Sequence, residues 1–159
     1  MTSTQRASQA TFGLLVVACF AAFFITQRLK HTPTVVQRFE MAGHFEPTSG
    51  GVHAEEAISF RLSHTEKATV TIENSAGDDV ATLVRNRLLV RYKQFSLRWN
   101  GRTGVARSHS VLLAPDGHSF FIPHNTGRLA PAGEYHVRVY LPESGRAVVS
   151  PRSFELIAR

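Results

Sequence analysis

The chain has 159 residues, of which 43% are hydrophobic and 19% are charged, and this composition excludes a wholly disordered protein. Its formal net charge of +6 favours contact with anionic partners such as lipid headgroups, acidic wall polymers or nucleic acid. The single cysteine, Cys19, excludes an intramolecular disulfide and a zinc site built from cysteines. The length leaves room for one domain of ordinary size behind a short N-terminal segment.

Residues 1–10 form a polar tail, and residues 11–27 follow it as an apolar run without a charged side chain. The run is close to the roughly 17 residues that a membrane-spanning helix needs at minimum. We predict an uncleaved signal anchor that enters the lipid bilayer through residues 11–27. A cleaved or lipidated signal ending near Cys19 and a buried helix are the alternatives. The apolar run continues through residues 23–25, which favours the anchor because a cleaved signal would turn polar after its small residues.

The charges that flank this run do not decide its orientation. Arg6 precedes the run, whereas Arg28, Lys30 and Arg38 follow it. The positive-inside rule, applied alone, would keep the following domain in the cytoplasm. However, a single N-terminal anchor in front of a long domain usually exports that domain, and long domains cross largely regardless of charge. The orientation therefore stays open on charge alone.

Residues 28–53 are predicted to be a linker, because proline and glycine recur there among few apolar residues. From residue 54 the pattern changes to alternation with period two, which predicts β-strands. No segment after residue 30 has a helical period, and the sequence therefore predicts an all-β sandwich over residues 54–159. Trp99 is predicted to anchor its core. The predicted strands are residues 57–62, 69–73, 80–84, 95–99, 135–139, 147–149 and 154–156.

Three of these segments carry a resemblance to a known family: Ile58-Ser-Phe-Arg-Leu62, Leu97-Arg-Trp-Asn-Gly-Arg102 and Pro131-Ala-Gly-Glu-Tyr135. Their order is similar to that of the Ig-like domain of the flagellar hook-capping (FlgD) type, a fibronectin type III-like sandwich of bacterial envelope proteins. The resemblance covers residues 45–156. It implies an antiparallel sandwich of about seven strands, an extracytoplasmic location, and an adhesive or spacer role without catalysis.

The chain departs from this family at two places. Many members open with a loop whose Asn and Asp oxygens suit calcium, but Thr48, Gly50 and Ala54 stand where those ligands would be. Since hard cations need several oxygen ligands, we expect no calcium site, and we expect no other cofactor. In addition, residues 104–127 separate the Trp turn from the Gly-x-Tyr strand start. We predict an inserted β-hairpin there, with Asp116-Gly117 at its tip, as the place for a function of this chain's own.

The candidate binding residues form a basic group and a histidine group. Arginines attract anionic lipids or wall polymers, although arginines on the solvated face of a strand are the simpler interpretation. The histidines surround the predicted hairpin, whose base would bring two of them together. No short metal-ligand spacing accompanies them, and no metal site is predicted. The candidates are Arg85, Arg87, Arg91, Lys93, Arg98, His109, Asp116, His118 and His124.

No catalytic residue is predicted, because the chain has no Gly-x-Ser-x-Gly elbow and Ser108-His109-Ser110 are strand neighbours that face opposite sides. No nucleic-acid motif accompanies the arginines, so nucleic acid is not an expected partner. These observations lead to one hypothesis: a single-pass protein of the bacterial cytoplasmic membrane whose extracytoplasmic Ig-like module binds or scaffolds an envelope protein or an anionic wall polymer. The alternative is a small envelope enzyme, metal-dependent or hydrolytic, with its site at residues 104–127.

Overall fold

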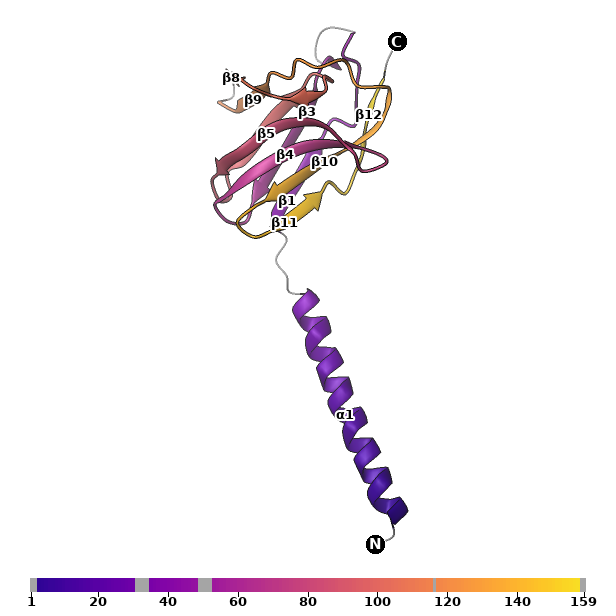
Figure 1. Cartoon of the computed structure of the whole chain (residues 1–159). Coiled ribbons are helices and arrows are strands. Elements are labelled where there is room, and N and C mark those ends of the chain that lie inside the picture. Colours follow the sequence, from indigo (N-terminus) through magenta and orange to yellow (C-terminus); the bar gives the residue numbers. More distant parts are fainter. Residues whose placement is uncertain (1–2, 31–34, 49–52, 116, 158–159) are drawn as a thin grey trace. The chain divides into compact units, whose positions relative to one another are not determined.

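The computed structural model describes residues 3–30, 35–48, 53–115 and 117–157. The chain divides into two units, Met1–Thr34 and Val35–Arg159. The first unit contains a helix, and the described part of the second is all-β, as the sequence predicts (Figure 1).

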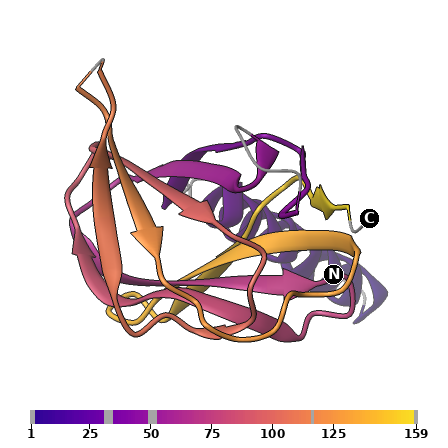
Figure 2. The ribbon, with the colours of Figure 1, turned by 90° about the horizontal axis from the view of Figure 1, so that it is seen from above.

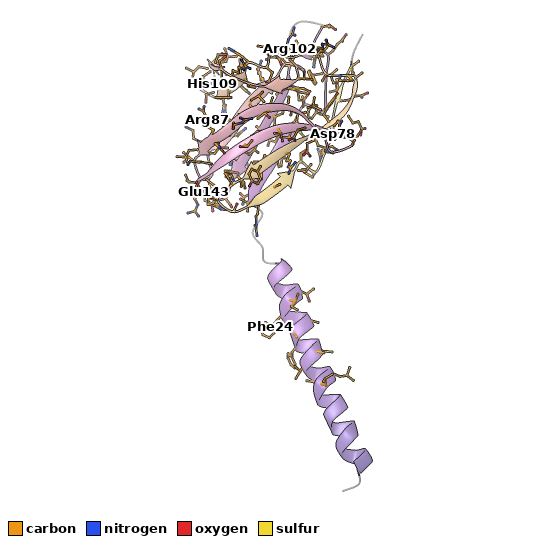
Figure 3. All side chains as sticks on the ribbon, in the orientation of Figure 1. Phe24, Asp78, Arg87, Arg102, His109 and Glu143 are labelled. Carbon is orange, nitrogen blue, oxygen red and sulfur yellow. The ribbon has the colours of Figure 1, made fainter. Side chains whose placement is uncertain are left out.

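Helix α1 spans Ser3–Lys30 and therefore extends beyond the predicted segment at both ends. Its side chains are described for residues 12–26, and all of these are exposed. They include large apolar side chains such as Leu14, which is 72% exposed, and Phe24, which is labelled in Figure 3. Within the part of the chain that is described, no helix is both long enough and apolar enough to cross a membrane.

The described residues of the second unit form two mixed sheets (Figures 1 and 2). The five-stranded sheet has the order β1 (Val36–Met41), β3 (Glu56–Leu62), β6 (Gln94–Trp99), β9 (Ser119–Pro123) and β8 (His109–Leu113). The seven-stranded sheet has the order β2 (His44–Phe45), β12 (Phe154–Leu156), β10 (Gly133–Leu141), β4 (Glu66–Asn74), β5 (Asp79–Leu89) and β7 (Gly104–Val105), and β11 (Arg146–Val149) also pairs with β10.

One hydrophobic core joins the two sheets, because the alternating apolar side chains of both face the same interior. Trp99 of β6 is fully buried, which confirms its predicted role, and its ring centroid lies 5.6 Å from that of Tyr135 in the other sheet. The indole N–H of Trp99 donates to the carbonyl of Arg102 at 2.9 Å, so the ring is buried without an unsatisfied donor. Burial of each such large apolar side chain contributes about 1.5–3 kcal/mol.

Two predictions about this architecture are wrong. The predicted linker of residues 28–53 contains strands β1 and β2, and the β unit begins at Val35, because Val36 and Phe45 are buried in the core. The predicted sheets were antiparallel, but β6–β9, β5–β7 and β2–β12 are parallel pairs. Between β6 and β9 the chain passes to the other sheet as β7 and returns to the first sheet as β8. Because β9 is antiparallel to β8, it runs in the direction of β6.

The predicted hairpin at residues 104–127 is confirmed: β8 and β9 pair antiparallel. Ala114 donates its N–H to the carbonyl of His118 at 2.8 Å, and Gly117 adopts a φ of 81° that favours glycine in the turn. Asp116 lies outside the described residues. Because β9 also pairs with β6, the hairpin forms one edge of the five-stranded sheet, and Figure 2 shows its orange tip projecting from the body of the domain.

Candidate functional site

A basic groove lies between strand β5 of one sheet and the β8–β9 hairpin of the other. It consists of a hollow of about 170 Å³ and a second of about 300 Å³, and both are lined by Arg87 and Phe121. Arg87 and His109, both labelled in Figure 3, come from different sheets and line the second hollow together. We call this feature the β5–β8 groove, and its defining residues are Arg85, Arg87, Lys93, Arg107, His109 and Phe121.

Phe121 forms the floor of the groove and positions two of its polar side chains. The guanidinium carbon of Arg87 lies 4.4 Å from the Phe121 ring centroid. The His109 ring stacks on the same ring, with centroids 4.2 Å apart and planes inclined by 24°. A cation over an aromatic face at a partly exposed site contributes about 0.5–1 kcal/mol. The charge of Arg87 is therefore held at the groove by the ring beneath it.

A β-bulge in β5 places Arg85 at the groove. Ala68 pairs with Arg87 and Val70 pairs with Val84, so two residues of β5 lie opposite the single residue between them in β4. The second of these bulge residues, Asn86, has a φ of 47° and donates its N–H to the Thr69 hydroxyl at 3.1 Å. The bulge interrupts the alternation of β5 and leaves Arg85 exposed.

The cations of the groove have no acidic neighbour in its walls. Among the described residues that line the two hollows, none is Asp or Glu, and Asp116 lies outside the described residues. Arg85, Lys93 and Arg107 are exposed, and Arg87 is half-buried. An approaching anion therefore meets Arg87 and Lys93 at the first hollow, and Arg85, Arg87 and Arg107 at the second, without a carboxylate in the described lining of either. Attraction of this kind weakens as salt is added.

Two of the predicted basic residues have other partners. Arg98 lies on the opposite face of its sheet from the core, 4.7 Å above the Phe120 ring and 3.7 Å from the Glu55 carboxylate. The Arg91 guanidinium donates to the Tyr92 hydroxyl at 2.9 Å. The structure thus gathers Arg85, Arg87 and Lys93 but separates Arg98 from them.

The predicted histidines are dispersed. His109 belongs to the groove, His118 lines a separate hollow beside Phe120, and His124 lies between two serine side chains. Alternation along the paired strands gives His109 and His124 different partners, although both lie near the hairpin base. In the described part of the chain, no group of three His, Cys, Asp or Glu side chains is arranged to hold a metal ion.

A serine–histidine cluster on the hairpin was not predicted. The Ser110 hydroxyl lies 3.1 Å from Nε2 of His124, and the Ser108 hydroxyl lies 3.2 Å from Nδ1 of the same ring. The two serines are separated by two positions in the sequence and therefore share one face, but their histidine comes from across the hairpin. The sequence contains the i, i+2 serine pair as a signal, whereas the partner depends on the strand register. Arg107 and Phe121 of the groove were also missed.

Two buried acidic groups with shifted pKa values lie outside the groove. The Glu56 carboxylate is fully buried, and its Oε1 accepts N–H groups from Ala42 at 2.7 Å and Gly43 at 3.3 Å. Burial raises the pKa of Glu56 above its usual value, although these hydrogen bonds partly oppose the rise. Burial also raises the pKa of Tyr135, whose hydroxyl donates to the carbonyl of Pro131. Both groups fix loops beside the core.

No protein-family model matches this chain. Comparison with curated proteins also found no match.

Proposed function

We propose that the chain is a non-catalytic, membrane-anchored Ig-like module that binds an anionic partner in the bacterial cell envelope. The observation that carries this proposal is the β5–β8 groove, whose two hollows share Arg87 and are also lined by Lys93 in one and by Arg85 and Arg107 in the other, without a carboxylate in the described walls. The groove is open to solvent, and its charges come from three separate parts of the chain that the fold brings together. A protein segment or an acidic wall polymer would supply the complementary charge.

The proposed anchor is supported by the first unit. Residues 11–26 contain no charged side chain, and the described side chains of α1, residues 12–26, are exposed and apolar apart from Thr26. An apolar environment would shield these exposed apolar side chains from water. In this proposal residues 11–27 cross the cytoplasmic membrane once, and the β unit lies on the extracytoplasmic side.

The proposed Ig-like character is supported by two features beside the core. The buried Trp99 packs across the two sheets, and the Tyr135 hydroxyl donates back to the backbone four residues upstream at Pro131. A tyrosine near a strand start that hydrogen-bonds to upstream backbone is a feature of immunoglobulin-type sandwiches. The three parallel pairs are a departure from a simple antiparallel sandwich. The resemblance to the FlgD-type domain is part of this proposal.

The anionic-partner proposal is tested with the full chain in detergent micelles, titrated with poly(glycerol phosphate) and with an acidic peptide. We expect at least one of the two to bind, with an affinity that falls as salt rises, because exposed charges are screened. Arg85→Glu is expected to weaken binding about tenfold, since it both removes and reverses a charge in the groove. Arg146→Glu, on β11 and outside the groove lining, is the matched control. Equal binding by both variants would contradict the proposal.

The location is tested separately by protease treatment of spheroplasts that carry an epitope tag after Arg159. Loss of the tag in intact spheroplasts is the expected result. Protection of the tag until lysis would place the β unit in the cytoplasm and contradict an envelope role.

A second candidate function, a small hydrolase, is favoured by the Ser110–His124 pair, since a hydroxyl within hydrogen-bond reach of an imidazole is the arrangement of a nucleophile and its base. Labelling by a fluorophosphonate probe tests it. A hydrolase requires labelling that disappears in Ser110→Ala and persists in the control Ser119→Ala. We expect no labelling of the wild-type chain, because His124 is exposed and its second nitrogen faces a serine rather than a carboxylate.

A further inference from the structure

The open edge of strand β8 gives the partner a more definite form. Building on the proposed anionic partner, we propose that the β5–β8 groove takes an extended acidic polypeptide segment, which adds to β8 as a further strand of the five-stranded sheet. Three observations carry this inference: the direction of the β8 backbone groups, the lack of protection along the edge, and the position of the cations beside it.

The backbone groups of alternate β8 residues point away from the sheet. His124 donates its N–H to the Ser108 carbonyl at 2.9 Å, and Ala114 donates to the His118 carbonyl at 2.8 Å. In an antiparallel pair this register makes Ser110 and Leu112 the residues that bond to β9. The N–H and C=O groups of the intervening residues, 109, 111 and 113, therefore face the side of β8 that no described strand pairs with, at the end of its sheet.

The edge of β8 lacks the features with which proteins usually prevent strand addition. Its last three residues are Val111, Leu112 and Leu113, which are 55%, 46% and 73% exposed. The register with β9 runs without a bulge, and the strand contains no proline, lysine, arginine or acidic residue. A regular, exposed, apolar edge of this kind is a template for another strand.

The arginines of the groove determine which side chains the added strand must have. Val111 pairs directly with Phe121 and lines the groove, so alternate side chains of a strand beside β8 would enter the groove on that face. There they would meet Arg85, Arg87 and Arg107. The remaining side chains would lie on the other face, beside Leu112. The partner is therefore a segment of about five or more residues in which acidic and apolar side chains alternate.

Two other occupants fit the edge less well. A second copy of this chain would bring its own Arg85, Arg87 and Arg107 towards the same cations, and like charges oppose that pairing. A membrane surface would attract the arginines, but acyl chains offer no partners for the outward N–H and C=O groups, which are costly to bury unpaired. An acidic strand satisfies both the backbone groups and the charges.

The probe is an acetylated nine-residue peptide in which Glu alternates with Val, labelled for fluorescence anisotropy and titrated into the full chain in detergent micelles. The same peptide with every interior amide N-methylated keeps the charge but loses its donors, and a version with Lys in place of Glu reverses the charge. We expect saturable binding of the acidic peptide and at least about tenfold weaker binding of both controls.

Two variants of the edge provide the decisive comparison. Val111→Pro removes an N–H that faces outward and leaves the ladder to β9 intact, and we expect it to weaken peptide binding by about tenfold. Val111→Thr keeps the N–H and a branched side chain and is expected to bind within about twofold of the wild type. Leu113→Pro repeats the test at a second outward position, so that poor folding of one proline variant does not remove the comparison.

Failure of this inference is distinguishable from failure of the proposed function. Binding of poly(glycerol phosphate) without binding of the peptide would overturn the strand-addition inference and leave the anionic-partner proposal standing. Binding of neither would overturn both. Equal affinity for the acidic and the N-methylated peptide, or a β8-paired dimer of the free chain that excludes the peptide, would also overturn the inference.

Discussion

Strands β5 and β8 border the same groove, yet they protect their free edges in different ways. Beyond its short pairing with β7, β5 carries a bulge at Asn86 and the charged Arg85 and Arg87. Strand β8 has a regular register and three exposed apolar residues. Bulges and charges on β5 prevent another strand from adding there, and the same devices are absent from β8. The contrast indicates that the domain discourages pairing at one edge and permits it at the other.

The largest effect on the free energy of unfolding is expected from Phe121→Ala, which tests whether the β8–β9 hairpin is packed against the core. Phe121 is 7% exposed and contacts both Arg87 and His109. Loss of its ring should lower the free energy of unfolding by about 3 kcal/mol or more, measured by urea denaturation. Leu113→Ala, at an exposed position of the same hairpin, should change it by less than about 0.5 kcal/mol. Similar values for the two variants would mean that the hairpin is an appendage rather than part of the sheet.

A change at Asn86 tests the bulge on β5. Its φ of 47° is costly for a β-branched residue, so Asn86→Val should lower the free energy of unfolding by about 1–2 kcal/mol. Asn86→Gly keeps the conformation accessible and should cost less than Asn86→Val. Thermal unfolding followed by circular dichroism gives both values. If valine were tolerated as well as glycine, the bulge would not be fixed by its backbone conformation, and the distinction between the two edges would weaken.

The other edge of the five-stranded sheet is held by Glu56, which accepts the two N–H groups that follow β1. Burial raises the pKa of Glu56, so the folded state binds its proton more tightly than the unfolded state does. The free energy of unfolding should therefore fall as pH rises from the usual carboxyl pKa through the raised pKa. Glu56→Gln removes this titration, and the wild type should lose stability relative to the variant over that pH range. A difference in the free energy of unfolding between the wild type and Glu56→Gln that does not change with pH would contradict the titration of Glu56 as its cause.

The smallest effect on stability is expected from adding protection to β8. Leu113→Glu places a charge on the exposed edge and should change the free energy of unfolding by less than about 0.5 kcal/mol. Binding of the alternating Glu–Val peptide, followed by fluorescence anisotropy, should nevertheless weaken relative to the wild type. Leu88→Glu, at an exposed position on the already bulged β5, changes the net charge equally and should weaken peptide binding less. Equal effects of the two substitutions would remove the contrast between the edges.

Strands with one buried face could be predicted from the sequence, because alternation in segments such as residues 57–62 directly reflects burial. Strand β1 was missed because only Val36 of its residues is fully buried and Arg38 interrupts it with a positive φ. The hairpin was predictable from its turn residues. The groove was not, since Arg87 and Phe121 lie in different sheets and meet only when β9 pairs with β6 and the two sheets pack together. Such long-range contacts leave no local pattern in the sequence.

The most direct test of the account is residue-resolved amide hydrogen exchange of the free full chain in detergent micelles, read along β8. We expect alternation: slow exchange at Ser110 and Leu112, whose N–H groups bond to β9, and fast exchange at His109, Val111 and Leu113, whose N–H groups face the free edge. Uniformly slow exchange would mean that the edge is already paired, and uniformly fast exchange would mean that the hairpin is not formed. Either result would contradict an edge that is formed and free to accept a strand.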